Sequence, residues 1–190
     1  MIRRPLEPDP GNTGGGKNTM SKSNYDTKIL AEIAITVALS TALSTIKIYT
    51  MPFGGSVTLG SMVPLFLISF RRGPKVGIIA GAIHGLIQFI FQPYVLTPVQ
   101  VILDYPLPWA LIGLSGFFKK KPYVGTFVGI LGRFLSHYVS GVLFWYMYAE
   151  RWAPIVYSAI YNGLYLVPEL IITSILVYFL LKRGILEFMI

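Results

Sequence analysis

Six ionisable side chains interrupt segments of the sequence that are otherwise apolar, and these residues could do chemistry. They are Glu32, His84, Asp104, Arg133, His137 and Glu169. Inside a membrane span such a side chain costs about 2.5–3.5 kcal/mol on insertion scales, so each one needs a partner or a function. A buried carboxylate can accept paired hydrogen bonds from a cationic or donor-rich ligand. The pattern therefore indicates either structural ion pairs or a binding site.

Asp104 is the first candidate for a ligand contact. A helix is predicted to begin at Thr97-Pro98, since proline is favoured at the first helical position. Asp104 and Gln100 then share one face, because residues four apart lie one above the other on a helix. Two interpretations remain open for Asp104, namely pairing with an arginine or binding of a cationic ligand.

A second group of candidates lies on one stripe of a later helix. Arg133, His137, Gly141 and Trp145 are spaced by four residues. Gly141 would leave room for a flat ring between the imidazole and the indole. Trp145 could stack on that ring or belong to the ordinary interfacial aromatic belt. Arg133 is expected to be a structural partner of Glu169 or of a backbone carbonyl.

Tyr157 and Asn162 begin the last apolar segment. An amide inside a membrane span needs several hydrogen bonds, and those between helices contribute only about 0.6–2 kcal/mol each. Asn162 is therefore either a link between helices or a ligand contact.

The composition places these residues in a membrane protein. The chain has 190 residues, of which 54% are hydrophobic and 13% charged. A soluble domain carries about 25% charged residues, so the composition argues against a soluble enzyme or a nucleic-acid-binding module despite the net charge of +8. With no cysteine, the sequence also excludes disulfides, thiolate metal sites and cysteine nucleophiles.

The apolar segments predict an all-α polytopic membrane protein with six transmembrane helices. A span needs about 20 apolar residues, and the expected spans are 28–48, 57–70, 75–91, 97–118, 122–148 and 153–181. The second and third are short, which suggests tilt or ends packed against neighbouring helices. Residues 1–26 read as a disordered tail without the features of a secretory signal, and residues 27–190 as one membrane domain.

The basic residues orient this topology in the cell membrane with both termini in the cytoplasm. Of the 16 Lys and Arg residues, all but three then fall in the inner segments 1–28, 71–75, 119–121 and 182–183. Lys47 and Arg151 fall outside, and Arg133 lies within the fifth span. This bias follows the positive-inside rule.

Depth brings the candidates together in the outer half of the membrane. Asp104 lies early in an inward-running helix, His137 and Trp145 late in an outward-running one, and Tyr157 and Asn162 early in the next. Tyr94 lies in the short outer connection before them. The sequence therefore predicts an outward-facing pocket for a small, flat and cationic molecule.

The absent motifs argue against catalysis and against an internal motor. The chain has no phosphate-binding GxxxxGK[ST] loop, no HExxH and no nucleophile elbow. A binding component that needs an external motor fits best, since the six expected spans show no internal repeat of the kind usual in secondary transporters. Ala34, Ala38 and Ala42, at steps of four, favour close approach of another helix, from a partner or from this chain.

Five stretches carry a resemblance to a known family. They are ISFRRG at 68–73, LTPVQVILDY at 96–105, GLSGFF at 113–118, RFLSHYVSGVLFW at 133–145 and YSAIYNG at 157–163. From about Lys28 to Lys182 the chain resembles the thiamine-binding substrate components of energy-coupling factor transporters. The combination of HxxxGxxxW with a downstream YSxxxNG is the specific part of the match.

The resemblance implies a six-helix protein that captures thiamine from outside and binds no cofactor. A membrane coupling subunit and two ABC ATPases, which alone bind ATP, then drive its uptake. By resemblance, the family's ligand contacts fall on seven residues: Tyr94, Asp104, Tyr105, His137, Trp145, Tyr157 and Asn162. Its alanine motif for docking on the coupling subunit falls on Ala34 and Ala38.

The sequence departs from the family pattern at two places. Asp104 stands where a glutamate is expected, and Gly54-Gly55 stand where a tryptophan would cover the pocket, so Phe53 or Tyr49 could cover it instead. Two alternatives stay open. One is a substrate component for a precursor such as hydroxymethylpyrimidine or another flat vitamin. The other is a small proton-coupled carrier using Asp104, His137 and Glu169 as a relay.

Overall fold

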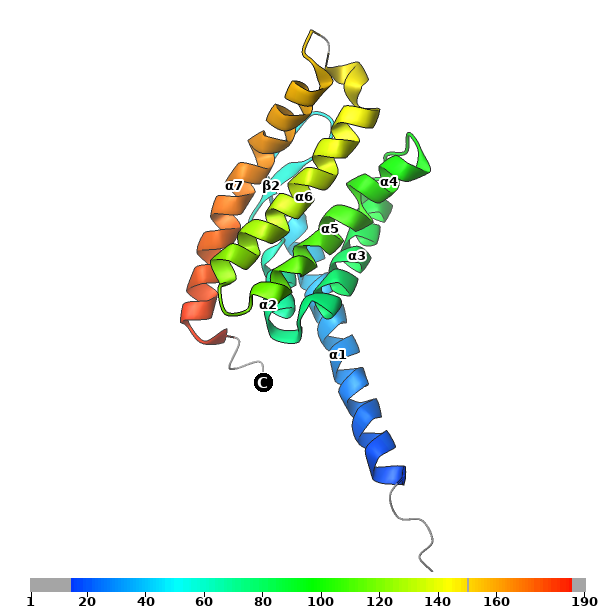
Figure 1. The fold of residues 1–190 in the computed structure, drawn as a ribbon, viewed down its shortest axis with the longest axis vertical. Coiled ribbons are helices and arrows are strands. Elements are labelled where there is room, and N and C mark those ends of the chain that lie inside the picture. The colour runs from blue at the N-terminus through cyan, green and yellow to red at the C-terminus, as the bar shows by residue number, and fades with distance from the viewer. Residues whose placement is uncertain (1–14, 150, 186–190) are drawn as a thin grey trace, which may run out of the picture.

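The helices of this protein run side by side along the long axis of the molecule, with a short β-hairpin packed among them (Figure 1). The structure is a computed structural model that describes residues 15–149 and 151–185. In chain order the elements are α1 (Gly15–Ser44), β1 (Lys47–Thr50), β2 (Ser56–Thr58), α2 (Val63–Arg72), α3 (Pro74–Phe91), α4 (Pro98–Asp104), α5 (Pro106–Ile112), η1 (Gly113–Phe118), α6 (Pro122–Phe144), η2 (Tyr146–Tyr148) and α7 (Pro154–Lys182).

Five helical segments among the described residues are long and apolar enough to cross a membrane. They are Asp26–Ser44, Pro74–Phe91, Pro98–Phe118, Pro122–Phe144 and Pro154–Lys182. The predicted third and sixth spans agree with α3 and α7 to within a residue. The fifth is shorter than predicted, because α6 ends at Phe144 and the chain continues into η2.

The predicted second span, 57–70, is wrong. Strand β2 occupies its start, and it pairs antiparallel with β1 in a two-stranded hairpin. The remainder belongs to α2, whose 10 residues cover about 15 Å, half of a hydrocarbon core of about 30 Å. Leu65 and Phe66 of α2 are fully buried. The stretch is apolar because protein surrounds it, and such burial gives the same composition as contact with lipid.

The predicted first span, 28–48, is displaced towards the N-terminus. Helix α1 ends at Ser44 and β1 begins at Lys47, while the start of α1 at Gly15 lies inside the predicted tail. Residues 15–26 are thus helical in the structure. Residues 1–14 of the predicted tail lie outside the described residues.

The predicted fourth span, 97–118, is interrupted in its middle. Helix α4 ends at Asp104 and α5 begins at Pro106, with Tyr105 at φ −117° and ψ −81° between them. Pro106 has no N–H to donate to the preceding turn, and it disfavours helical geometry at the residue before it. At this break the Leu103 carbonyl accepts a 2.7 Å hydrogen bond from Ser136 Oγ of α6. A broken helix was not expected from the sequence.

Helix α3 approaches the broken segment through three glycines spaced by four residues. A Cβ on Gly77 would meet Ser69 and the backbone of Gly113, one on Gly81 the carbonyl of Trp109, and one on Gly85 the carbonyl of Tyr105. Small residues at such spacing let two helix backbones come into contact. The three glycines therefore fix where α5 lies, and with it the break.

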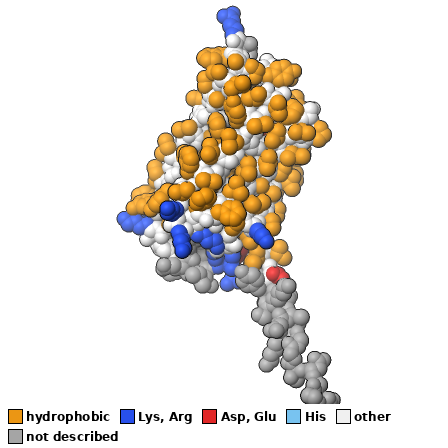
Figure 2. All heavy atoms as spheres, in the orientation of Figure 1, with side chains coloured by type: hydrophobic (Ala, Val, Ile, Leu, Met, Phe, Trp, Pro, Cys, Tyr) orange, Lys and Arg blue, Asp and Glu red, His pale blue; other side chains and the backbone are white. Residues whose placement is uncertain are grey.

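The end of the bundle opposite the hairpin is basic. Figure 2 shows Lys and Arg side chains gathered there beneath a broad apolar surface. Glu32 of α1 binds both arginines that end α2, with Arg72 in a two-pronged pair at 2.6 Å and Arg71 at 3.3 Å. Higher in α1, Thr41 Oγ1 lies 3.2 Å from Nδ1 of the fully buried His84. Both ionisable residues, Glu32 and His84, are thus paired within the protein.

We expect Gly81→Ala to destabilise the protein and Gly163→Ala to leave its stability unchanged or slightly raised. The added methyl at position 81 would meet rigid backbone, a form of overpacking that costs about 1–3 kcal/mol. Nothing lies within 4 Å of a Cβ on Gly163, and alanine favours helix over glycine by about 1 kcal/mol. Thermal unfolding in detergent measures both. Equal unfolding temperatures for the two variants would contradict the close α3–α5 contact.

Candidate functional site

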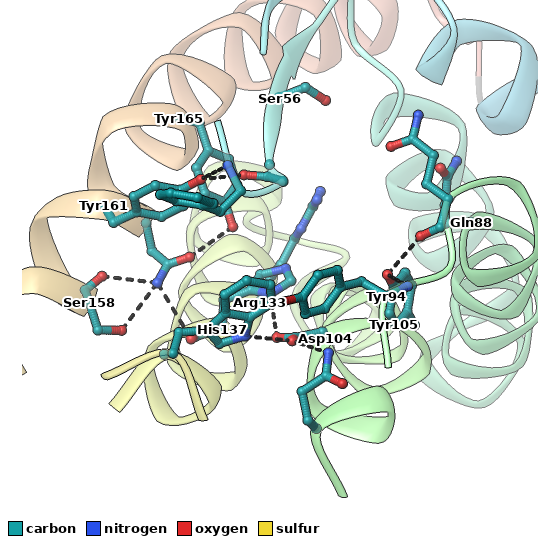
Figure 3. A pocket seen from close by; sticks show the side chains of 18 of the residues that line it. Ser56, Gln88, Tyr94, Asp104, Tyr105, Arg133, His137, Ser158, Tyr161 and Tyr165 are labelled. Carbon is teal, nitrogen blue, oxygen red and sulfur yellow. Dashed lines mark hydrogen bonds and ion pairs between the residues drawn. The ribbon is translucent and has the colours of Figure 1, made fainter. Parts of the chain in front are cut away.

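A cavity of about 450 Å³ opens among α3, α4, α6, α7 and the β1–β2 hairpin (Figure 3). All seven residues singled out from the sequence line it: Tyr94, Asp104, Tyr105, His137, Trp145, Tyr157 and Asn162. They lie on or directly beside α4, α6 and α7, and in the connection before α4. The structure therefore brings every predicted site residue to one place.

Asp104 stands at the end of α4, where several donors orient its carboxylate. Oδ2 accepts hydrogen bonds from Gln100 Nε2 at 2.7 Å and from Trp145 Nε1 at 3.2 Å, and Oδ1 lies 3.4 Å from His137 Nδ1. The bond to Gln100 confirms that the two residues share a helix face. Gln100 Oε1 also accepts from Leu96 N–H, so its amide is fixed at both ends. The carboxylate is oriented before any ligand arrives.

The stripe on α6 is present, but its glycine has a second role. His137, Gly141 and Trp145 all line the cavity. A Cβ on Gly141 would meet Ser158 Oγ of α7, so the missing side chain lets α7 approach α6 as well as leaving space beside the cavity. The buried Nε2 atom of His137 has no hydrogen-bond partner among the described residues.

Asn162 is held by the protein itself. Its Nδ2 donates to Ser158 O at 2.9 Å and, more weakly, to His137 O at 3.4 Å. Its Oδ1 accepts from Tyr165 O–H at 2.9 Å. These bonds fit the interpretation of Asn162 as a link between α6 and α7, and the residue still faces the cavity.

Tyr105 supports the outer connection between α3 and α4. Its hydroxyl donates to Gln92 O at 2.7 Å and accepts from Tyr94 N–H at 3.0 Å. The backbone before α4 is thereby held beside the cavity.

An aromatic cluster covers the side of the cavity near η2. The Tyr94 ring stacks on Trp145 with centroids 4.7 Å apart, and its hydroxyl lies 3.1 Å from that of Tyr148. The centroid of the Tyr148 ring lies 4.3 Å from that of Phe53, at the tip of the hairpin. Phe53 lines the cavity, as suggested for a covering residue, whereas Tyr49 is absent from the lining. The sequence offered no signal for Tyr148 beyond its aromatic surroundings.

The hairpin, which sequence analysis missed as an element, forms one wall of the cavity. Tyr161 O–H donates to Gly54 O at 2.9 Å and accepts from Phe53 N–H at 2.9 Å. Gly54 and Gly55 have φ of 96° and 86°, a backbone region that favours glycine. A Cβ on Gly55 would also press on the ring of Tyr165. The paired glycines between two short extended runs were the available signal.

Arg133 and Glu169 do not form the direct ion pair that the sequence suggested. The Arg133 guanidinium lies over the ring of Trp109, with Cζ 3.8 Å from the centroid. Glu169 Oε1 accepts instead from the N–H and the Oγ1 of Thr58, at 2.6 and 2.7 Å. Arg133 lines the cavity, together with Gln88, Gln92, Tyr161 and Tyr165, none of which was a predicted contact.

Comparison with known proteins decides the family. Residues 30–187 match the model of a family described as thiamine transporter protein (Thia_YuaJ). The chain belongs to this thiamine transporter family. The family is one of transporters and not of enzymes. This match agrees with the resemblance to thiamine-specific S components that was drawn from the sequence.

Individual members of the thiamine transporter family cover most of the chain. The thiamine transporter ThiT of Bacillus subtilis is 38% identical over an alignment of 175 residues, and the match covers 82% of this chain and 91% of that protein. ThiT of Lacticaseibacillus paracasei is 30% identical over 71% of this chain and 77% of its own length. A solved structure of ThiT from Listeria monocytogenes superposes with a TM-score of 0.76 at 30% identity, covering 84% of this chain and 96% of that one.

We expect Tyr161→Phe to loosen the hairpin without unfolding the bundle. The change removes both hydrogen bonds that hold Phe53 and Gly54, each contributing about 1 kcal/mol. Amide hydrogen exchange across residues 52–56 should accelerate about five- to thirtyfold. Tyr146→Phe, at an exposed tyrosine in η2, is the control and should change nothing there. Unchanged exchange in Tyr161→Phe would mean that other contacts hold the hairpin.

Proposed function

We propose that this protein is the thiamine-binding subunit of an energy-coupling factor importer, and that the cavity is its binding site. The observation that carries the proposal is the Asp104 carboxylate, pre-oriented by Gln100 and Trp145 beside His137 in an aromatic-lined cavity. Thiamine combines an aminopyrimidine, which can donate to a carboxylate, with a cationic thiazolium, which aromatic faces attract. Membership in the thiamine transporter family supports the same ligand.

In this proposal Asp104 holds the aminopyrimidine edge, and Asn162 and Tyr157 assist it from α7. Trp145 and Tyr94, which already stack on each other, supply aromatic surface, with His137 next to them. Tyr105 acts through the outer connection that it holds. The hairpin and Phe53 cover the cavity in place of the tryptophan expected at Gly54-Gly55. The same carboxylate would serve any aminopyrimidine, so a precursor such as hydroxymethylpyrimidine is the competing ligand.

In this proposal the cavity opens to the outside of the cell and the basic end of the bundle lies on the cytoplasmic side. Both termini are then in the cytoplasm. Support comes from Lys and Arg side chains, which gather at the end opposite the cavity (Figure 2) as the positive-inside rule requires. Transport then depends on a membrane coupling subunit and two ABC ATPases, as the resemblance to S components implies. A proton relay has less support, since Glu169 bonds to Thr58 and does not line the cavity.

Ala34 and Ala38 are the proposed docking positions for the coupling subunit. Both are exposed on α1, which contributes no residue to the lining of the main cavity. Small side chains at this spacing let a second helix approach closely within lipid. Capture and docking would therefore use different helices.

Asp104→Asn should weaken thiamine binding by about a hundredfold, because a charged acceptor for a donor-rich cation is replaced by a neutral amide. Isothermal titration of the purified protein with thiamine measures the effect, with tryptophan fluorescence followed on the same samples. Glu32→Gln, which removes a carboxylate near the basic end, is the control and should bind like the original protein. Binding of free hydroxymethylpyrimidine without thiamine would favour the precursor, and silence from both would reject the proposal.

Ala34→Leu and Ala38→Leu should abolish thiamine uptake by cells that contain the full transporter, while thiamine affinity of the purified subunit stays unchanged. The larger side chain would keep the partner helix at a distance. Ala34→Ser, which keeps the small volume, should retain uptake. Uptake by the leucine variants at the original rate would exclude this face as the docking surface.

A further inference from the structure

A second, smaller cavity of about 40 Å³ adjoins the main one, and we call it the side chamber. The two cavities share five lining residues: Ser56, Gln88, Gln92, Trp109 and Arg133. The rest of the side chamber is lined by Ser44, Lys47, Thr58, Ser61 and Glu169. Every one of these side chains carries a polar atom, and the volume is sufficient for water.

Two buried ionisable residues from neighbouring helices line the side chamber. Arg133 of α6 is 8% exposed and Glu169 of α7 is 1% exposed. No ion pair within 4.0 Å is formed by either among the described residues, and Arg133 Nε and Glu169 Oε2 have no hydrogen-bond partner there. Both side chains line the same small chamber, so a charge on one acts on a charge on the other. Burial makes such an interaction strong, because water screens it little.

Arg133 creates a difficulty for a cavity that is proposed to take a cation. Figure 3 shows its side chain extending into the middle of the main cavity. An uncompensated guanidinium at that position would repel thiamine by the same Coulomb interaction that attracts it to Asp104. Asp104 is bound to Gln100 and Trp145 and lies beside His137. Glu169 is the carboxylate that lines the side chamber together with Arg133.

We propose that Glu169 is a specificity-determining residue that neutralises Arg133 across the side chamber and so makes the main cavity selective for a cationic ligand. Glu169 acts through its charge at a distance, and it does not touch the ligand. The inference rests on the proposed function, since it requires that the ligand be cationic.

Glu169 has a separate structural role that the test must hold constant. Its Oε1 accepts both hydrogen bonds from Thr58, at the end of the hairpin wall. Glu169→Gln keeps an oxygen acceptor for Thr58 and removes the charge. Glu169→Leu removes both, so comparison of the two separates the electrostatic effect from the loss of hairpin support.

The experiment is a double-mutant cycle on the affinity for thiamine, measured by isothermal titration of the purified protein. Glu169→Gln alone should weaken thiamine binding by about tenfold. In the Arg133→Gln background the same change should alter the affinity by less than about twofold, because no charge is left to neutralise. In the Arg133→Lys background, which keeps the charge, the loss should return.

A neutral ligand and a control variant provide two further tests. Should Arg133→Gln fail to fold, the cycle is replaced by a comparison of two ligands. Hydroxymethylpyrimidine is neutral at mildly alkaline pH, so Glu169→Gln should weaken its binding much less than the binding of thiamine. Lys47→Gln is the control for the exposed cation of the side chamber and should leave thiamine affinity within about twofold.

The outcomes separate this inference from the proposed function. Failure of the original protein to bind thiamine would reject the proposed function. Normal binding by the original protein, with an equal loss from Glu169→Gln in all three backgrounds, would overturn only the charge compensation. So would an equal loss for thiamine and for the neutral pyrimidine.

Discussion

The interruption of the helical segment at Tyr105 is the constraint on which the cavity depends. Backbone groups within the membrane must find partners inside the protein, so a break there requires support from neighbouring helices. Ser136 provides a hydrogen bond by donating to the Leu103 carbonyl, and the missing side chain of Gly85 lets α3 pack directly against the backbone at Tyr105. Because of the break, the consecutive residues Asp104 and Tyr105 make different contacts. Asp104 meets His137 and Trp145, while Tyr105 holds the outer connection.

Helix α7 organises the opposite wall through one stripe of residues spaced by four. Tyr161 binds the tip of the hairpin, Tyr165 packs beneath Gly55, and Glu169 holds Thr58 at the end of β2. An isolated two-stranded hairpin is at best marginally stable in water, so this one depends on its contacts with α7. The wall of the cavity is therefore only as rigid as the contacts made by this stripe.

The sequence predicted the cavity better than it predicted the elements that form it. Helical spacing relates Asp104 to Gln100 and His137 to Trp145, and the depth of each residue within its span is enough to bring Tyr94 and Asn162 to the same level. The hairpin could not be predicted in this way. Burial inside the protein makes residues 57–70 apolar, and hydropathy does not distinguish a protein environment from a lipid one. The break had a local signal in Pro106 itself. The prediction nevertheless followed the continuous apolar run of the segment and treated it as one helix.

The contacts of α1 connect the proposed docking face to the cavity. Thr41 of α1 lies beside His84 of α3, and His84 Nε2 lies 3.3 Å from Nε2 of Gln88, which lines the cavity. Gln88 also donates to Ser44 at the end of α1. Any shift of α1 that follows docking must either break these contacts or move Gln88, because His84 is fully buried and packed edge-on against Trp109. The Arg133 guanidinium lies over the Trp109 ring. A movement of α1 that displaced Trp109 would therefore also displace the positive charge of Arg133, which repels a cationic ligand.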